Sequence, residues 1–387
     1  MAKAKKHNTS KALVIGGGIA GVAVSVKLGL SGIPVLLIEK TSEIGGHAKE
    51  MGCKATDVCL RCNVCVANEI LRSAANSPAI TLYTSTEIFD IREGINGSRF
   101  QAILSHNKAP KKSKSGENPC HDRLMSSFTA EPNGNGQTVV DIDSIIIATG
   151  YEPYNPLENS SYGYGSVPNV ITGMDAEKQL AEKQKILRVS DGTIPERIAF
   201  IQCVGSRTQE IYRANDYTDY CSTVCCAYAL RMGRLLKYQS KESQITLFYM
   251  DIQNFGKGFD SFYNECKNDM NFICSRPYEI TNGENGSVRI KYASENNGDS
   301  NSGVCEEEFD LVVLSVGIRP PADAWSLADK LSVAVDQQGF FGLKNVMGLP
   351  DLQREGIYVV GASESPKDIA GCIAQAEAVS ALVLSQM

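Results

Sequence analysis

The sequence predicts an α/β protein made of two Rossmann-like domains, one inserted in the other. Near the N-terminus a glycine-rich turn joins an apolar strand at 12–15 to a helical pattern at 19–30. The same strand, helix, strand order begins again at 198–201. In both halves a later apolar strand runs into a glycine, Gly150 and Gly317. A length of 387 residues suits two or three domains of about 150 residues each.

The first domain is expected to comprise residues 1–160 and 330–387. Between 106 and 137 the composition shifts to Lys, Ser, Asn, Pro and Gly, which favours a mobile surface insertion because such a segment buries little apolar surface. Apolar runs and helical periodicity predict the other elements in chain order. They are strands at 12–15, 35–38, 80–83, 88–92, 100–105, 144–148 and 355–361, and helices at 19–30, 67–75 and 368–384.

The second domain is expected to comprise residues 161–329. Its first strand at 198–201 leads to a helix at about 222–237 and a strand at 245–250. A further apolar strand at 311–315 completes a second parallel sheet.

Composition excludes several classes of function. The net charge of -6 offers no basic field, so nucleic acid is not an expected partner. No apolar stretch reaches the roughly 18 residues of a membrane span and no signal sequence is recognised, so we expect a cytoplasmic chain without direct membrane insertion. In a reducing compartment, thirteen cysteines indicate metal or redox chemistry more than structural disulfides.

The first glycine-rich turn predicts a dinucleotide site. Gly16, Gly18 and Gly21 follow the G-x-G-x-x-G spacing, which allows a tight turn, close approach of a pyrophosphate and close packing of helix on strand. The phosphates are then expected at the helix N-terminus. Glu39, at the end of the second strand, is placed to bind a ribose. A glycine-rich turn without a ligand is the alternative.

Two further signatures resemble the flavin disulfide reductase family. They are Gly45-Gly46-His47, soon after Glu39-Lys40, and Ile147-Ala148-Thr149-Gly150. The resemblance implies that both domains have the fold of this family and that the first one binds FAD. The turn after the last strand, where the family binds flavin, reads Gly361-Ala362-Ser363-Glu364 here. The residues expected to bind the cofactor are Gly16, Gly18, Gly21, Glu39, Lys40, Gly46, His47, Ile88, Thr149, Gly150, Gly361, Lys367 and Asp368.

The matching turn of the second domain has lost the glycine pattern. It keeps only Gly205, and Cys203 stands where a pyrophosphate would lie. Cys221, Cys225 and Cys226 follow at the predicted start of a helix, where Cys221 and Cys225 would share one face. Four thiolates are what a [4Fe–4S] cluster needs. Buried free cysteines are the alternative.

These segments closely resemble the A subunit of heterodisulfide reductase, and the resemblance covers nearly the whole chain. It implies an oxidoreductase subunit with a [4Fe–4S] cluster at Cys203, Cys221, Cys225 and Cys226. In such relatives a lysine near the flavin follows the paired cysteines, whereas Arg231 stands here. The matching motifs are Gln202-Cys203-Val204-Gly205-Ser206-Arg207, Tyr220 to Cys226, Phe248-Tyr249-Met250-Asp251, Phe255-Gly256-Lys257-Gly258 and Pro366-Lys367-Asp368-Ile369.

Another cysteine group lies at 53–65, within the first expected domain. Cys53, Cys59, Cys62 and Cys65 contain C-x2-C-x2-C, which resembles the ligand runs of ferredoxins and predicts a second [4Fe–4S] cluster. A four-cysteine zinc site is the alternative. The run also resembles the short form of the A subunit found in sulfur-oxidising complexes or in quinone-interacting oxidoreductases.

The combined reading is an electron-transfer subunit that converts between two-electron and one-electron carriers. No catalytic side chain stands out. The resemblance implies iron–sulfur partners similar to the B and C subunits of heterodisulfide reductase, and a homodimer is expected because two-fold dimers are the commonest closed assembly. The alternatives are a stand-alone NAD(P)H-dependent flavin disulfide reductase and a zinc-binding scaffold.

Overall fold

A computed structural model shows that the chain forms two compact units. The first unit comprises Met1–Lys49, Cys65–Glu152 and Pro320–Met387, and the second comprises Glu50–Val64 and Pro153–Arg319. Most of the insertion expected at 106–137 lies outside the described residues. The structure describes residues 10–95, 97–106, 131–132, 136–207, 218–253, 256–294, 303–343 and 352–387.

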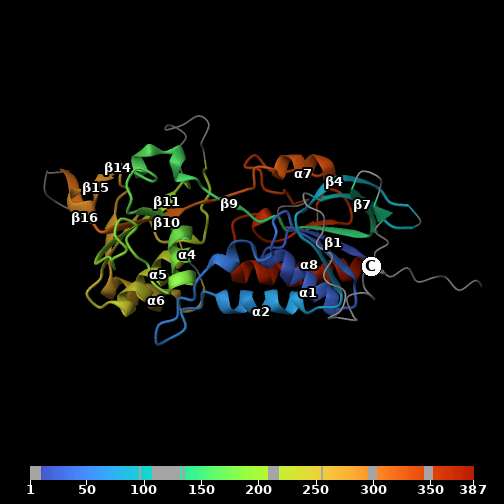
Figure 1. Ribbon diagram of the computed structural model, residues 1–387, viewed down its shortest axis with the longest axis horizontal. Coiled ribbons are helices and arrows are strands. Elements are labelled where there is room, and N and C mark those ends of the chain that lie inside the picture. Colours follow the sequence, from blue (N-terminus) through green and yellow to red (C-terminus); the bar gives the residue numbers. More distant parts are fainter. Residues whose placement is uncertain are drawn as a thin grey trace, which may run out of the picture. The chain divides into compact units, whose positions relative to one another are not determined.

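A five-stranded parallel sheet forms the centre of the first unit, in the order β19-β8-β1-β2-β3 (Figure 1). Strands β1, β2 and β8 are buried along their whole length, as strands covered on both faces are. This sheet confirms the predicted α/β class. The strands are β1 (Ala12–Ile15), β2 (Val35–Ile38), β3 (Ile80–Tyr83), β8 (Ser144–Ile147) and β19 (Ile357–Val359).

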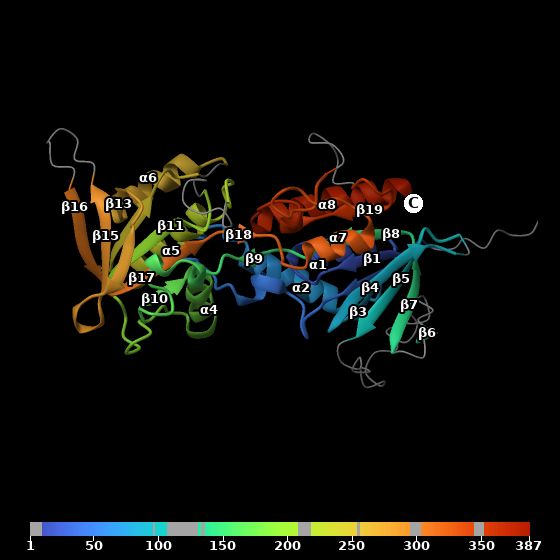
Figure 2. The same ribbon diagram turned by 90° about the horizontal axis from the view of Figure 1, so that it is seen from above.

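Alternating side chains of this sheet build two cores. Val14 packs with Val22 of α1 and Val379 of α8, two helices that run side by side in Figures 1 and 2. Leu13 faces the other way, toward Phe100 of an antiparallel sheet. The helices are α1 (Ile19–Leu30), α2 (Val64–Ala75), α7 (Ala324–Leu331) and α8 (Ile369–Gln386), and the antiparallel strands are β4 (Thr86–Glu93), β5 (Phe100–His106), β6 (Glu131–Pro132) and β7 (Gln137–Ile142).

Helix α8 is long and apolar enough to cross a membrane by length and composition, with a mean hydropathy of 1.3. Its apolar side chains, however, include Cys372, Ala376, Val379 and Val383, all of which lie in the core beside α1. A core helix of this kind passes the same test, so α8 is weak support for a membrane span.

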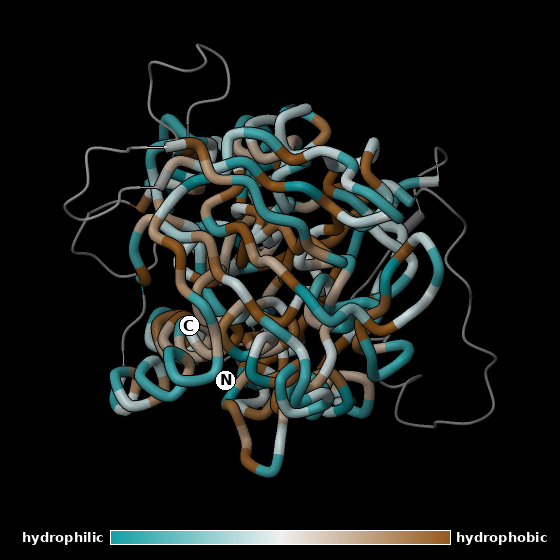
Figure 3. The backbone as a smooth tube through the Cα atoms, turned by 90° about the vertical axis from the view of Figure 1, so that its left-hand side faces the viewer, coloured by the Kyte–Doolittle hydropathy of each residue, from teal (hydrophilic) through white to brown (hydrophobic). Residues whose placement is uncertain are grey.

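The second unit repeats the parallel sheet, in the order β10-β17-β11-β12-β13. Helices α4, α5 and α6 cover one face, and a three-stranded antiparallel sheet covers the other (Figure 2). Hydrophobic stretches alternate with hydrophilic connections along the chain (Figure 3). The elements are β10 (Val170–Thr172), β11 (Arg197–Val204), β12 (Gln244–Tyr249), β13 (Asn271–Cys274), β17 (Leu311–Val316), α4 (Gly173–Lys183), α5 (Cys225–Gln239), α6 (Phe259–Asp269), β14 (Glu279–Asn282), β15 (Val288–Ser294) and β16 (Gly303–Phe309).

The division into units differs from the expected boundaries in two ways. The main segment of the second unit begins at Pro153 and ends at Arg319, earlier at each end than the expected 161–329. The segment Glu50–Val64, which carries Cys53, Cys59 and Cys62, belongs to the second unit, although its neighbours in sequence belong to the first. Long-range contacts of this segment, described below, are the physical reason.

Candidate functional site

Three glycines form the turn after β1, and each has a different structural role. Gly16 has a φ of +108°, and a Cβ there would lie 2.3 Å from the oxygen of Ala148. At Gly21 a Cβ would lie 2.0 Å from the oxygen of Gly16, which explains the close contact of helix and strand. At Gly18, by contrast, an added Cβ has no described atom within 4 Å. The backbone at the start of α1 is therefore open to a phosphate group.

Glu39 lies directly after β2 and is buried against the same turn. Its Oε2 accepts a hydrogen bond from the Gly17 N–H at 2.7 Å, and Oε1 accepts from the Thr41 N–H at 2.8 Å. A carboxylate has about four lone-pair sites, so acceptor capacity remains for a ribose hydroxyl. The predicted role of Glu39 thus fits its position.

The double-glycine segment lies against the first turn. The Gly45 N–H donates to the Gly17 oxygen at 2.7 Å, and a Cβ on Gly46 would lie 3.2 Å from the Gly18 Cα. His47 Nε2 lies 3.0 Å from the Tyr151 oxygen, next to Gly150 in sequence. The structure therefore brings Gly46 and His47 to the expected edge of the sheet.

Ser363 connects two of the flavin-family signatures and was not predicted as a site residue. Its Oγ accepts from the Gly150 N–H at 2.8 Å and lies 3.3 Å from the Thr149 Oγ1. Gly361 begins the same turn with a φ of +77°, and a Cβ there would lie 2.5 Å from the Ala20 Cβ. The end of β19 thus joins the edge formed by β1 and β8. Proximity to Gly361 in sequence was the signal that could have identified Ser363.

Four other predicted residues have contacts of their own. Asp368 caps α8 by accepting from the Gly371 N–H at 2.7 Å, and the Lys367 ammonium pairs with Glu364. Lys40 forms an exposed ion pair with Asp323 at 3.3 Å. The Ile88 side chain lies in the core, and its oxygen accepts from Lys330 Nζ at 2.9 Å.

The end of β11 and the turn that follows it differ from the turn after β1 at two positions. Cys203 adopts a left-handed φ of +58° where the first turn has a glycine. Gly205 has a φ of +72°, and a Cβ there would lie 2.1 Å from the ring of Tyr154. Tyr154 therefore fills the space that stays open at Gly18. The loss of a phosphate-binding turn, inferred from the missing glycines, has this steric counterpart.

Cys221 lies before α5 and not on it, so the expectation that Cys221 and Cys225 share a helix face was wrong. Thr223 has a left-handed φ of +59°, which interrupts a helix between the two cysteines. The Thr223 N–H instead donates to the Cys221 Sγ at 3.3 Å. Ser222 fixes this segment, since its Oγ accepts from the Ile318 N–H at 2.8 Å.

The four thiols of the second unit lie near enough to affect one another's charge. Burial raises the pKa of Cys225, and the charges of Cys226, Cys203 and Cys221 raise it further. Burial likewise raises the pKa of Cys203, and that of Cys226 to about 11. The raised pKa keeps the Cys203, Cys225 and Cys226 thiols protonated at neutral pH, so a bound metal has to displace their protons. Among the described residues no three His, Cys, Asp or Glu side chains converge on one point as a single ion requires.

Two buried polar side chains near Cys203 lack partners among the described residues. Gln202 is 3% exposed and neither its Nε2 nor its Oε1 is hydrogen-bonded, and the same holds for the Ser315 Oγ. They lie on the adjacent strands β11 and β17. Unsatisfied groups of this kind mark a place where a polar or ionic ligand fits.

The first cysteine group repeats the local geometry of Cys221. The Arg61 N–H donates to the Cys59 Sγ at 3.4 Å, and Arg61 has a left-handed φ of +54°. Asn63 is also left-handed, with a φ of +61°. Backbone that alternates in this way forms concave anion sites, including those of iron–sulfur centres. Cys53, Cys59 and Cys65 are exposed and Cys62 is partly exposed.

Lys54 of this loop and Arg231 of α5 each connect the loop to the rest of the second unit. Neither contact was predicted. Lys54 and Glu177 form an ion pair at 2.6 Å with side chains only 3% and 5% exposed. Arg231 Nε donates to the Leu60 oxygen at 2.8 Å. Burial raises the pKa of Glu177 and the Lys54 charge opposes the rise.

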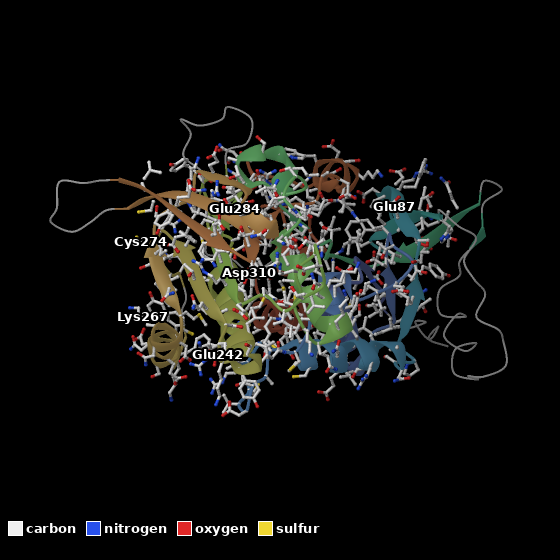
Figure 4. All side chains as sticks on the ribbon, turned by 60° about the vertical axis from the view of Figure 1, so that its left-hand side comes forward. Glu87, Glu242, Lys267, Cys274, Glu284 and Asp310 are labelled. Atoms are coloured by element: carbon white, nitrogen blue, oxygen red, sulfur yellow. The ribbon has the colours of Figure 1, made fainter. Side chains whose placement is uncertain are left out.

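The other described cysteines are divided between the core and the surface. Cys266 and Cys372 are buried, and burial raises their pKa to about 12 and about 11. Cys274 is exposed at the end of β13 (Figure 4). Cys305 is partly exposed, and Cys120 lies outside the described residues.

Comparison with known proteins supports the fold. Residues 14–59 match the NAD(P)-binding Rossmann-like domain family. The thioredoxin reductase of T. acidophilum superposes with a TM-score of 0.56 at 14% identity, covering 97% of each chain. The flavoprotein disulfide reductase RclA from Escherichia coli gives a TM-score of 0.54 at 14% identity, over 97% of this chain and 72% of that one. Flavin disulfide reductases therefore share this fold.

Sequence comparison is more specific. The H(2):CoB-CoM heterodisulfide,ferredoxin reductase of Methanothermobacter marburgensis has an A subunit that is 30% identical, over 96% of this chain and 63% of that protein. In Methanopyrus kandleri, an iron-sulfur A subunit of CoB–CoM heterodisulfide reductase is 31% identical, over 96% of this chain and 64% of that protein. The chain thus spans somewhat less than two thirds of these relatives. Over nearly all of its own length, the chain is similar to heterodisulfide reductase A subunits.

Proposed function

We propose that the chain is an FAD- and [4Fe–4S]-containing electron-transfer subunit of a heterodisulfide reductase-like complex. The observation that carries the proposal is the contrast between its two Rossmann turns. One leaves Gly18 open to a pyrophosphate, and the other replaces the phosphate site by Cys203 within a group of four thiols. FAD exchanges one or two electrons and a cluster one, so together they convert between the two kinds of carrier.

The first unit is proposed to hold the FAD. Gly16, Gly18 and Gly21 would receive the pyrophosphate at the start of α1, and Glu39 would accept hydrogen bonds from the ribose. The segments after β8 and β19 are proposed to complete the site. The candidate residues there are Thr149, Gly150, Gly361, Lys367 and Asp368, and the other candidates are Lys40, Gly46 and His47 after β2 and Ile88 of β4.

The second unit is proposed to hold a [4Fe–4S] cluster through Cys203, Cys221, Cys225 and Cys226. A cluster binds one thiolate at each iron, so its ligands need not converge on one point as the ligands of a single ion do. Burial, the N–H donor to Cys221 and the unsatisfied Gln202 amide support this fit. When bound, the cluster supplies one-electron transfer.

The first cysteine group is proposed to hold a second cluster through Cys53, Cys59, Cys62 and Cys65. The left-handed residues Arg61 and Asn63 and the N–H donor to Cys59 support an anionic metal centre. Zinc is the second candidate for this group, because a four-cysteine site with C-x2-C spacing also suits zinc, although no three such side chains converge among the described residues as a single ion requires. Metal analysis separates the two.

The complex and its location are proposals from homology. The names of the relatives describe subunits of heterodisulfide reductases, which supports partners similar to the B and C iron–sulfur subunits. A homodimer core and a cytoplasmic location are proposed with them. Neither nucleic acid nor a membrane is a proposed partner.

Anaerobic purification of the full chain, followed by flavin, iron and sulfide analysis, tests the proposal. We expect one FAD per chain, and Cys225→Ser should remove about four irons while FAD stays, because one of four thiolates is lost. Cys274→Ser is the matched control, because Cys274 is exposed and outside both groups. FMN in place of FAD, or equal iron in both variants and the parent chain, would refute the assignment.

A further inference from the structure

The loop with the first cysteine group is built into the second unit by two separate anchors. At one end the Lys54 Nζ lies 2.6 Å from Glu177 and 3.0 Å from the Gly52 oxygen, and the Gly52 N–H donates to Glu177 at 3.2 Å. Gly52 also packs closely on α4, where a Cβ would lie 2.6 Å from the Leu180 Cγ. This anchor is a fully buried network.

Arg231 of α5 is the second anchor. Its Nε donates at 2.8 Å to the oxygen of Leu60, the residue directly after Cys59 and two before Cys62. The same helix begins with Cys225 and Cys226 of the other cysteine group. Helix α5 therefore carries two cysteines of one group and the arginine that contacts the loop of the other.

We propose that Arg231 is a positioning residue for the metal centre of the first cysteine group and that it raises the reduction potential of that centre. This inference rests on the proposed function. A centre bound by four thiolates is anionic and gains a further negative charge on reduction. A cation held at the Leu60 oxygen, one residue after Cys59 in sequence, favours the reduced state, because net charge is one of the factors that set the potential of such centres.

The alternative is a purely structural hydrogen bond that closes the loop. Two substitutions separate these roles. Arg231→Lys keeps the charge and a donor, whereas Arg231→Gln keeps a donor and removes the charge. Arg234→Gln is a matched control on the same helix, because Arg234 pairs instead with Glu265 and Asp269 of α6.

The test is an anaerobic redox titration of the full chain, followed by electron paramagnetic resonance. The signal that Cys59→Ser removes identifies the first centre. We expect Arg231→Gln to shift the reduction equilibrium of this signal about tenfold toward the oxidised form, which is about 59 mV for one electron. Arg231→Lys should keep the potential close to that of the parent chain, and Arg234→Gln should leave the potential unchanged.

Other outcomes have distinct meanings. If the parent chain shows no signal that depends on Cys59, the proposed iron–sulfur centre fails and the inference fails with it. If that signal is present but keeps its potential in Arg231→Gln, the inference alone is overturned. If Arg231→Gln does not fold, Arg231→Met, which also removes the charge, is titrated in its place, and a shift smaller than twofold, equal to that of Arg234→Gln, overturns the inference.

Discussion

The turns after β1 and β11 lie at the centre of two parallel sheets and have opposite character. At the first turn Gly18 is open and α1 begins at once, at Ile19. At the second turn Tyr154 covers Gly205, and α5 begins only at Cys225. A Rossmann topology therefore provides a sheet edge at which a ligand can bind, and the residues of the turn decide which ligand binds there.

The second unit also contains a buried ion pair, formed by Lys54 and Glu177. Replacing Lys54 by Met leaves the Glu177 carboxylate buried and unpaired, which typically costs about 3–5 kcal/mol. We expect this loss in the free energy of unfolding measured with urea. The double variant with Glu177→Leu should regain most of it, because no charge then remains buried.

This loss should depend on pH. Burial raises the pKa of Glu177 above 4.5 in the folded chain, and Lys54 opposes that rise, so its removal raises the pKa further. A raised carboxyl pKa means that the folded state binds the proton more tightly than the unfolded state. The Lys54→Met variant should thus be least destabilised below pH 4.5 and lose stability as pH rises through the raised pKa. A loss that is independent of pH would contradict the buried unpaired carboxylate.

The sequence predicted the local elements well because apolar runs and glycines act locally. Strands at 35–38 and 80–83 agree with the structure to the residue. Cys221 was assigned to a helix because periodicity cannot show that Thr223 is left-handed. Lys54 and Glu177 are 123 residues apart, and no local pattern predicts such a pair. The fold and the position of the glycine-rich turn were thus predictable, and the contacts of the cysteine loop with the second unit were not.

A large side chain at Gly18 should fill the turn after β1, as the Tyr154 ring fills the space at Gly205. Gly18→Leu places a side chain where the phosphate is proposed to lie, while no described atom stands within 4 Å of the new Cβ. We expect FAD affinity to fall about a hundredfold, or about 2.8 kcal/mol. FAD content and titration of the flavin-free chain measure it. Gly18→Ala should have a smaller effect, and unchanged FAD content in Gly18→Leu would contradict the site.

The smallest expected effect concerns the turn at Gly205, which the Tyr154 ring fills. We expect no reaction of the chain with nicotinamide nucleotides. A pyrophosphate at the second sheet would need open backbone at the end of β11, where Cys203 and the Tyr154 ring lie instead. We therefore expect the flavin absorption of the FAD-loaded chain to stay constant under anaerobic NADH or NADPH. Dithionite is the positive control, since it reduces flavin without a binding site.

Opening the turn sharpens this prediction. Tyr154→Gly removes the ring from Gly205 but leaves Cys203 in place, so the steric obstacle is only half removed. We expect this variant to remain unreactive toward NADH, because two of the three glycines that a pyrophosphate requires are still missing from the turn. Rapid bleaching in the parent chain would show that the second unit still binds a nucleotide. Bleaching in the variant alone would show that Tyr154, and not Cys203, closes the site.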